Sequence, residues 1–141
     1  MSKKLSSITK SYLAGFIDGD GSIYVRLKPN KTYRYNFQVV SHVVLFQSQK
    51  NQKKFEKICS KINLGLLRVR KDGIMEYVIS KDDNVREFLI QIKPFLILKK
   101  RQADLMLEII AKRKKTRNEK DFQRLVELVN SLRDLNYSKK R

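Results

Sequence analysis

Two aspartates separated by one glycine close a short glycine-rich segment near the N-terminus. This segment, Leu13–Gly21, reads LAGFIDGDG and ends a stretch with helical spacing of apolar residues. Glycine inside a helix costs roughly 0.5–1 kcal/mol, but it lets another backbone come very close. Asp20 falls at the C-terminal end of the predicted helix, where the helix dipole disfavours an anion. Because a bound cation would relieve that conflict, the segment predicts a close helix–helix contact beside a metal-binding carboxylate.

Only one of the two aspartates is expected to serve such a site. At 100° per residue, Phe16 and Asp20 lie near one line along the helix, whereas Asp18 points elsewhere. An Asp-Gly-Asp-Gly sequence can also form an ordinary turn. A calcium-binding loop is excluded, because its sixth position would be Ile23 in place of glycine and its twelfth Pro29 in place of glutamate.

The composition indicates a partner rich in negative charge. The 141 residues include 32 Lys and Arg against 14 Asp and Glu, a net charge of +18, and 41% are hydrophobic, enough for a core. Nucleic acid is the natural partner for such an excess. A membrane surface is the rival polyanion, but no segment approaches the roughly 20 apolar residues of a spanning helix. We therefore expect neither a membrane nor a small-molecule substrate among the partners.

The single cysteine, Cys59, precludes an internal disulfide and fits a reducing compartment. It lies in an apolar helical stripe, so we expect it to be buried and unreactive. The N-terminus lacks the apolar stretch of a secretory signal. We expect the protein in the cytoplasm of a prokaryote, or in an organelle if an organelle genome encodes it.

Hydrophobic periodicity predicts the order helix, strand, strand, helix, strand, strand, helix, helix, helix. Consecutive strands that form hairpins favour an antiparallel sheet and an α+β fold. We expect one domain spanning residues 1–141, with a core over about 7–114 and a helical extension over about 118–136. The predicted ranges are helix 7–20, strands 22–27 and 33–46, helix 52–61, strands 66–70 and 74–80, a helix from 82 that Pro94 ends, and helices 99–114 and 121–135.

The segment LAGFIDGDG resembles the defining motif of the LAGLIDADG homing endonucleases. The resemblance covers about residues 8–112, and beyond about Thr116 only a helical pattern remains. A single copy of the motif is similar to the homodimeric branch of that family. Four further stretches recur in family order: Ser22–Ile23 with the strand that follows, the loop Lys28–Asn30, QKNQKK at 49–54, and PFLILKKRQA at 94–103.

The resemblance implies an αββαββα core whose antiparallel sheet forms a DNA-binding saddle, followed by C-terminal helices. It also implies that the motif helices of two subunits pack side by side at the dimer axis. The residues expected at this dimer interface are Leu13, Ala14, Gly15, Phe16 and Gly19.

The resemblance further implies a catalytic site at the end of the motif helix. Asp20 would bind Mg²⁺, which Mn²⁺ or Ca²⁺ could replace in binding, and the Gly19 carbonyl would be a further ligand. The family surrounds its metals with polar and basic side chains, which by alignment are Gln49, Lys53 and Lys99. A small insertion leaves Gln47 as an alternative to Gln49, and Lys50 or Lys54 as alternatives to Lys53.

The sheet should read the DNA, because an antiparallel ribbon fits the major groove and its outer side chains reach base edges. Some of these positions would be ordinary solvent-facing residues. His42, the only histidine, is expected to be a DNA-face or packing residue and not a catalytic base. The basic run 112–117 would contact phosphates without reading sequence. The predicted DNA-binding residues are Tyr24, Arg26, Lys28, Asn30, Tyr33, Arg34, Asn36, Gln38, His42, Arg68, Arg70 and Glu76.

The function implied is that of an intron-encoded, site-specific homing endonuclease. It would hydrolyse both strands of a long pseudo-palindromic DNA target in a metal-dependent reaction that leaves 3′ overhangs. The alternative is a catalytically silent DNA- or RNA-binding relative, such as an intron RNA maturase. Asp20, Gln49 and Lys99 favour retained nuclease chemistry. A structural RNA-binding protein would explain the charge but not the glycine-rich helix.

Overall fold

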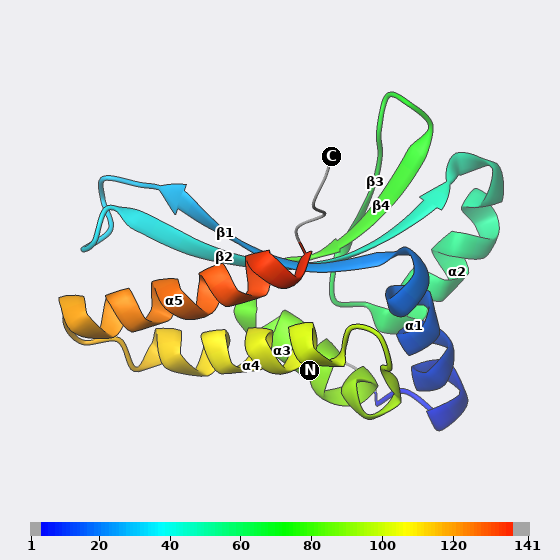
Figure 1. The fold of residues 1–141 in the computed structure, drawn as a ribbon. Helices are drawn as coiled ribbons and strands as arrows, with labels where there is room; N and C mark the ends of the chain where they lie inside the picture. The colour runs from blue at the N-terminus through cyan, green and yellow to red at the C-terminus, as the bar shows by residue number, and fades with distance from the viewer. Residues whose placement is uncertain (1–3, 137–141) are drawn as a thin grey trace.

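Helices gather against one face of a four-stranded antiparallel sheet in the computed structural model, which describes residues 4–136 (Figure 1). The order of elements is the predicted one, and the fold is α+β. Short 3-10 helices cover Gln49–Asn51 and Lys93–Phe95. The other elements are α1 (Ser7–Asp20), β1 (Gly21–Pro29), β2 (Phe37–Ser48), α2 (Gln52–Ile62), β3 (Leu66–Val69), β4 (Ile74–Ile79), α3 (Asp82–Ile92), α4 (Lys100–Lys114) and α5 (Glu119–Asn136).

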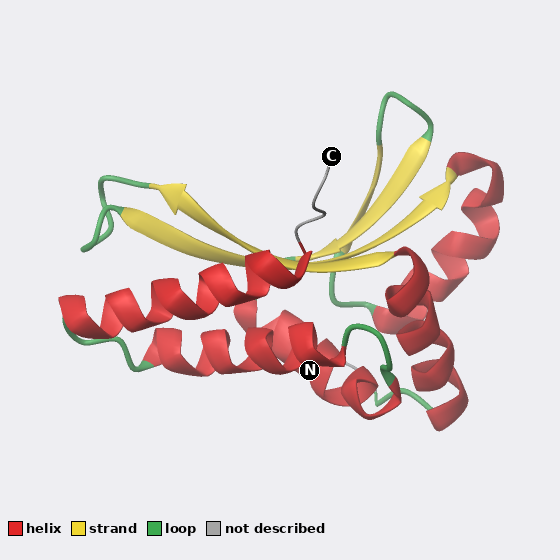
Figure 2. Ribbon diagram, viewed as in Figure 1, coloured by secondary structure: helices red, strands yellow, loops and turns green. Residues whose placement is uncertain are grey.

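The sheet joins two hairpins side by side in the order β1-β2-β4-β3. Strand β2 connects them, since it pairs with β1 and, over its second half, with β4. The tight β3–β4 turn uses Gly73 at φ +83°, a left-handed conformation that glycine adopts without strain. Figure 2 shows the helices of residues 4–136 beneath the sheet and none of them over its upper face, with a hairpin rising at either end. The sheet therefore presents one open, saddle-like surface.

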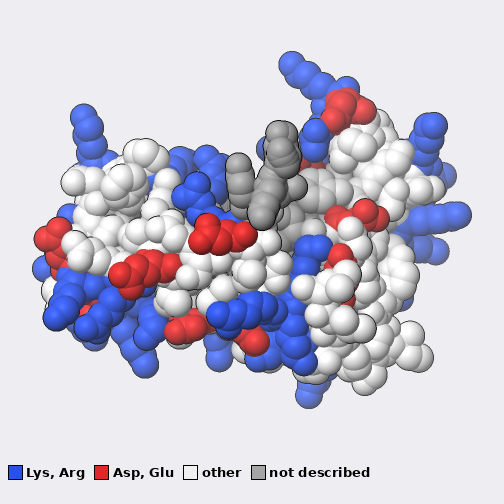
Figure 3. All heavy atoms as spheres, viewed as in Figure 1, with Lys and Arg blue, Asp and Glu red and all other residues white. Residues whose placement is uncertain are grey.

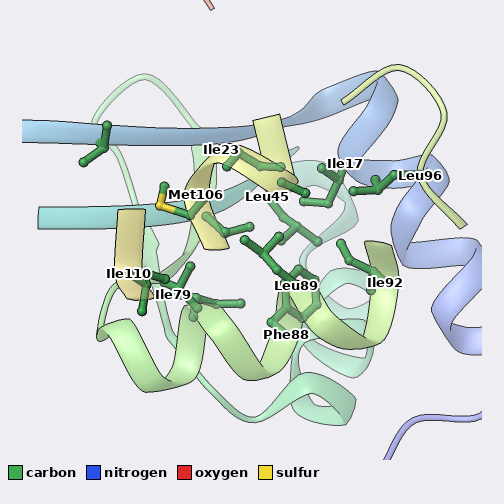
Figure 4. Close-up of a cluster of buried hydrophobic side chains, with 14 of the residues drawn as sticks. Ile17, Ile23, Leu45, Ile79, Phe88, Leu89, Ile92, Leu96, Met106 and Ile110 are labelled. Atoms are coloured by element: carbon green, nitrogen blue, oxygen red, sulfur yellow. The ribbon is translucent and has the colours of Figure 1, made fainter. Parts of the chain in front are cut away.

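The hydrophobic core lies between the sheet and the helices (Figure 4). Alternate strand residues enter it, as the period of two predicts. Helix α5 belongs to the same core, because its Leu125, Val129 and Leu132 are buried there. Burying one such side chain stabilises the fold by roughly 1.5–3 kcal/mol, so the apolar face of each strand determines which face stays open. The central contributors include Ile17, Ile23, Leu45, Ile79, Phe88, Leu89, Ile92, Met106 and Ile110.

One predicted strand begins later than expected. The prediction started it at residue 33, but β2 begins at Phe37. Residues 30–36 instead form two successive turns, in which the amide of Tyr33 donates to the Asn30 carbonyl and the amide of Asn36 to the Tyr33 carbonyl. These local hydrogen bonds compete with the ladder and overcome the strand propensity of the tyrosines.

Cys59 is buried in α2, as predicted. Burial, with a smaller contribution from Glu56, raises the pKa of its thiol to about 12, so the reactive thiolate is scarce at neutral pH. No helix within residues 4–136 has the length and apolar character needed to cross a membrane.

Candidate catalytic site and nucleic-acid interface

Asp20 is exposed at the junction where α1 passes directly into β1. The amide of Gly21 donates to the Ile17 carbonyl and ends the helix. A Cβ on Gly21 would lie 2.7 Å from the Cα of Ile17, so only glycine permits this abrupt change from helix to strand. The junction holds Asp20 at the edge of the sheet, next to the carbonyls that a helix end leaves without intrahelical donors.

One side of α1 is open to solvent, and we call its residues Ile8, Tyr12, Gly15 and Gly19 the α1 face. They recur at the spacing of one helix side. Ile8 is 83% exposed and Tyr12 55% exposed. Apart from the helix's own backbone and the neighbouring residues, no atom of residues 4–136 lies within 4 Å of a Cβ added at Gly15 or Gly19. The α1 face therefore combines exposed apolar side chains with two positions at which a second backbone can approach closely.

The predicted interface roles of Leu13 and Ala14 are wrong. Both are completely buried in this chain's own core, on the side of α1 opposite Gly15 and Gly19. Phe16 lies between the two sides and stacks on Phe55 of α2 at 5.9 Å between ring centroids. The helix therefore uses its larger motif residues to attach to its own sheet and leaves its glycines to the outside.

Lys99 lies at the end of α1, where the sequence placed it. Its Nζ donates to the Asp18 carbonyl oxygen at 2.8 Å, and its backbone amide donates to the Asp18 carboxylate at 3.0 Å. The amide of Ile97 donates to the same carboxylate at 2.8 Å. Asp18, to which the sequence gave no role, thus holds the segment before α4 against α1. The sequence signal for a separate role of Asp18 was its position on the other side of the helix from Asp20.

The segment held by Asp18 also carries two exposed apolar residues that sequence reasoning missed. Ile97 is 82% exposed and Leu98 is 73% exposed. Exposed apolar residues that cluster beside an apolar helix face usually mark an interaction surface. The run Phe95–Leu98 in the sequence was the only signal, and it reads equally well as core.

The strand register separates the candidate glutamines. Leu45 pairs with Gly21, so Gln47 lies two residues further along β2, on the same face and level with the end of α1. Gln49 instead lies beside the β3–β4 turn, where its backbone amide donates to the Gly73 carbonyl at 2.8 Å. Gln47 Oε1 accepts from the Ser48 amide and from the Asn51 side chain. Gln47 thus shares the face of β2 that carries the buried Leu45, and the assignment of Gln49 to the catalytic site stays a prediction.

The predicted Lys53 and its alternatives Lys50 and Lys54 lie along or just before α2. None of their side chains hydrogen-bonds to α1 in the described part of the chain, and the pairing of Lys53 with Lys99 stays a prediction. Within residues 4–136, no three His, Cys, Asp or Glu side chains come together as a metal cluster.

Most predicted DNA-binding residues share the uncovered face of the sheet, here called the outer face. Cross-strand pairs include Tyr24 with His42, and Lys28 with Gln38. On the other hairpin, Arg68 pairs with Glu76 across β3 and β4, and their side chains form an ion pair at 2.7 Å. Figure 3 shows Lys and Arg side chains projecting from both hairpins and from α2. The members of the outer face are Tyr24, Arg26, Lys28, Gln38, His42, Arg68, Arg70 and Glu76.

His42 is half-buried beneath this surface. Its ring stacks on Tyr24 at 4.8 Å between centroids. Burial, reinforced by the charge of Arg26, lowers the pKa of His42 below its ordinary value. Neutral imidazole is therefore the form present at pH 7, and it adds no positive charge to the outer face.

The remaining predicted DNA-binding residues lie in the loop between β1 and β2 rather than on a strand. Tyr33, Arg34 and Asn36 are exposed there. Asn30 Oδ1 accepts hydrogen bonds from both the amide and the hydroxyl of Thr32, so this oxygen stabilises the loop.

Comparisons with known proteins agree with this geometry. The LAGLIDADG endonuclease family matches residues 13–107. DNA endonuclease I-CreI of Chlamydomonas reinhardtii is 37% identical over 134 residues, covering 92% of this chain and 80% of the relative. DNA endonuclease I-CvuI of Chlorella vulgaris is 33% identical over 117 residues, covering 83% of this chain and 71% of the relative.

Solved structures give the same result. The homing endonuclease I-CvuI in complex with DNA superposes with a TM-score of 0.87 at 29% identity, covering 95% of this chain and 85% of that one. The archaeal intron-encoded homing endonuclease I-Vdi141I bound to DNA has a TM-score of 0.81 at 23% identity, covering 95% and 87%, which shows the shared fold. From the family match over most of the chain and two relatives above 30% identity, we conclude that this chain belongs to the LAGLIDADG endonuclease family.

Proposed function

We propose that the chain is a homodimeric, metal-dependent DNA endonuclease that cuts both strands of a long, near-palindromic site and leaves 3′ overhangs. Asp20 carries the proposal: it is an exposed carboxylate at the end of a helix whose open side is lined by two glycines. The DNA endonucleases I-CreI and I-CvuI support it. Binding of DNA in the presence of divalent metal is supported by I-CvuI, which was crystallised with DNA in the presence of Ca and, with the DNA not cleaved, in the presence of Mg.

A second copy of the chain is the partner that the α1 face fits best. Gly15 and Gly19 allow two α1 helices to approach closely, and a two-fold axis between them brings the two Asp20 carboxylates together. The exposed Ile8, Tyr12 and Ile97 border this contact and would be buried by it. A dimer of this kind joins two outer faces into one continuous surface, which suits a symmetric DNA site.

The residues at the end of α1 suit Mg²⁺. The Asp20 carboxylate and the Gly19 carbonyl are oxygen donors, which Mg²⁺ prefers over nitrogen or sulfur. Two carboxylates brought together across a dyad also need a cation between or beside them. When bound, Mg²⁺ supplies an activated water and stabilises the charge that develops on the phosphate and the leaving oxygen.

The surrounding side chains have separate tasks in this proposal. Lys99 holds a positive charge at the end of α1, where it attracts and orients the scissile phosphate. Gln47, or Gln49, offers an amide that can hold the attacking water. The outer face reads base edges, with Arg26, Arg68 and Arg70 suited to guanine and Gln38 to adenine. Lysines of α2 and of the run 112–117 contact phosphates.

Removal of the metal will separate cutting from binding. The protein is incubated with a library of randomised inverted-repeat DNA in Mg²⁺, and the cut ends are sequenced. We expect one related set of near-palindromic sites, cut on both strands with 3′ overhangs. EDTA will reduce cutting to background, because Mg²⁺ is the group to which this proposal assigns activation of the attacking water. With Ca²⁺ in place of Mg²⁺, binding will persist. Cutting at unrelated sequences, or cutting that EDTA leaves unchanged, would contradict the proposal.

A further inference from the structure

The loop between β1 and β2, residues 30–36, is an ordered unit that we call the tip loop. The backbone amide of Asn30 donates to the backbone carbonyl of Asn36 at 2.9 Å, and this bond closes the base of the loop. Asn36 adopts φ +66°, a left-handed conformation that asparagine tolerates better than most residues. The loop holds its own shape by these bonds, but they do not determine how it is oriented relative to the rest of the protein.

Tyr35 connects the tip loop to α5. Its ring stacks on Phe122 with 4.8 Å between centroids and 17° between planes. The Tyr35 hydroxyl is buried and has no hydrogen-bond partner among the described residues. Because a buried, unsatisfied hydroxyl stabilises nothing, the ring contact must account for the position of Tyr35.

Helix α5 is a firm support for this contact. Leu125 and Val129 anchor it in the core, one and two turns after Phe122. At its far end, Asn136 Nδ2 donates to the Ile23 carbonyl of β1 at 2.6 Å. The helix thus bridges β1 and the tip loop at the end of the same hairpin.

The Tyr35–Phe122 stack is a narrow attachment. Around it, a hollow of about 550 Å³ separates the tip loop from α5, lined by Phe37, Gln123 and Val126 among others. On the loop side, the Arg34 guanidinium carbon lies 5.5 Å from the centre of the Tyr35 ring, within the range of a cation–π contact. Tyr35 therefore touches both the support beneath the loop and an exposed, predicted DNA-binding arginine above it.

We propose that Tyr35 is a positioning residue for base recognition: its stack on Phe122 orients the tip loop, and through it Tyr33 and Arg34, toward the outer base pairs of the target. The base pairs are outer ones because the tip loop closes the end of the β1–β2 hairpin that is opposite Asp20. This inference rests on the proposed endonuclease function and extends it to the contact with α5. Orienting a reading loop before DNA arrives lowers the ordering cost on binding. It also confines Arg34 to the geometry in which two donors meet one guanine.

Tyr35→Ala and Tyr35→Phe form a matched pair that tests the proposal. Both variants and the parent protein are given the same randomised inverted-repeat library with Mg²⁺, and base preference is determined position by position from the cut ends. Tyr35→Ala is expected to lose about tenfold in preference at the outermost base pairs, the size of one good base contact. Preference at the inner base pairs and the single-turnover cutting rate on the best site will stay within about twofold. Tyr35→Phe keeps the ring and will match the parent at every position.

Amide hydrogen exchange of the free proteins provides a second measurement that needs no DNA. Tyr35→Ala should speed exchange in residues 30–36, whereas strands β2 and β4 stay protected. Equal loss of preference at inner and outer positions would overturn the proposal, because it would indicate general destabilisation. Unchanged outer preference in Tyr35→Ala would overturn it too. If the parent protein selects no DNA site, the proposed function itself fails, which is a different result.

Discussion

Asp20→Asn will abolish DNA cleavage and leave DNA binding nearly intact. The amide keeps the shape of the side chain but removes the charge that holds a divalent cation. Losing metal-assisted stabilisation of several kcal/mol corresponds to a fall of at least about a thousandfold in single-turnover cutting. Binding measured in Ca²⁺-free buffer should stay within a few-fold of the parent or become tighter, because one negative charge per subunit near the phosphates is gone.

Asp134→Asn is the matched control for this variant. Asp134 is exposed on α5, and the same change there removes the same charge. It should cut at the parental rate. Equal cutting by Asp20→Asn and the parent would show that Asp20 does not hold the metal. Loss of binding and cutting together, with a normal melting temperature, would assign Asp20 to DNA contact instead.

Gly15→Leu will weaken dimerisation without destabilising the single chain. Space beyond Gly15 is open in the monomer, and leucine is a better helix former than glycine by up to about 1 kcal/mol. Where two backbones pack closely, an added side chain costs about 1–3 kcal/mol, and two-fold symmetry imposes that cost twice. Dimerisation should therefore weaken at least about thirtyfold, seen by sedimentation velocity, and cutting should fall with it.

Ala111→Leu is a suitable comparison, since Ala111 is exposed on α4 and the change also places a leucine on a helix surface. It should sediment and cut like the parent. A Gly15→Leu protein that remains dimeric would move the dimer contact away from the α1 face. A variant that fails to fold would contradict the open space seen beyond Gly15.

Local sequence signals predicted the elements well where one signal dominated. Pro94 ended the predicted helix near residue 93, and the Asp72-Gly73 pair gave the β3–β4 turn where the structure has it. The start of β2 was missed because the backbone of Tyr33–Asn36 forms hydrogen bonds within turns and not with a neighbouring strand. Residue propensities do not encode that preference. Helix positions were easier than strand starts because 14 residues of α1 repeat the same period.

The candidate site was predicted in part for similar reasons. Asp20 and Lys99 follow from the motif and its family order, and the structure brings both to the end of α1. Which side of α1 faces a partner did not follow, because small residues occur on both sides and only tertiary packing buries Ala14. The role of Asp18 needed a contact across 79 positions of sequence, to Ile97, that no local pattern reveals.

A crystal structure of the protein on its own DNA target with Mn²⁺ would test the central claim most directly, because anomalous scattering locates the metal independently of any assumption. The account predicts metal at coordination distance, about 2.1 Å, from Asp20 oxygens of both subunits. It also predicts Gly15 and Gly19 of one α1 packed against those of the other. Metal bound away from Asp20, or an α1 face left open to solvent in the DNA complex, would contradict it.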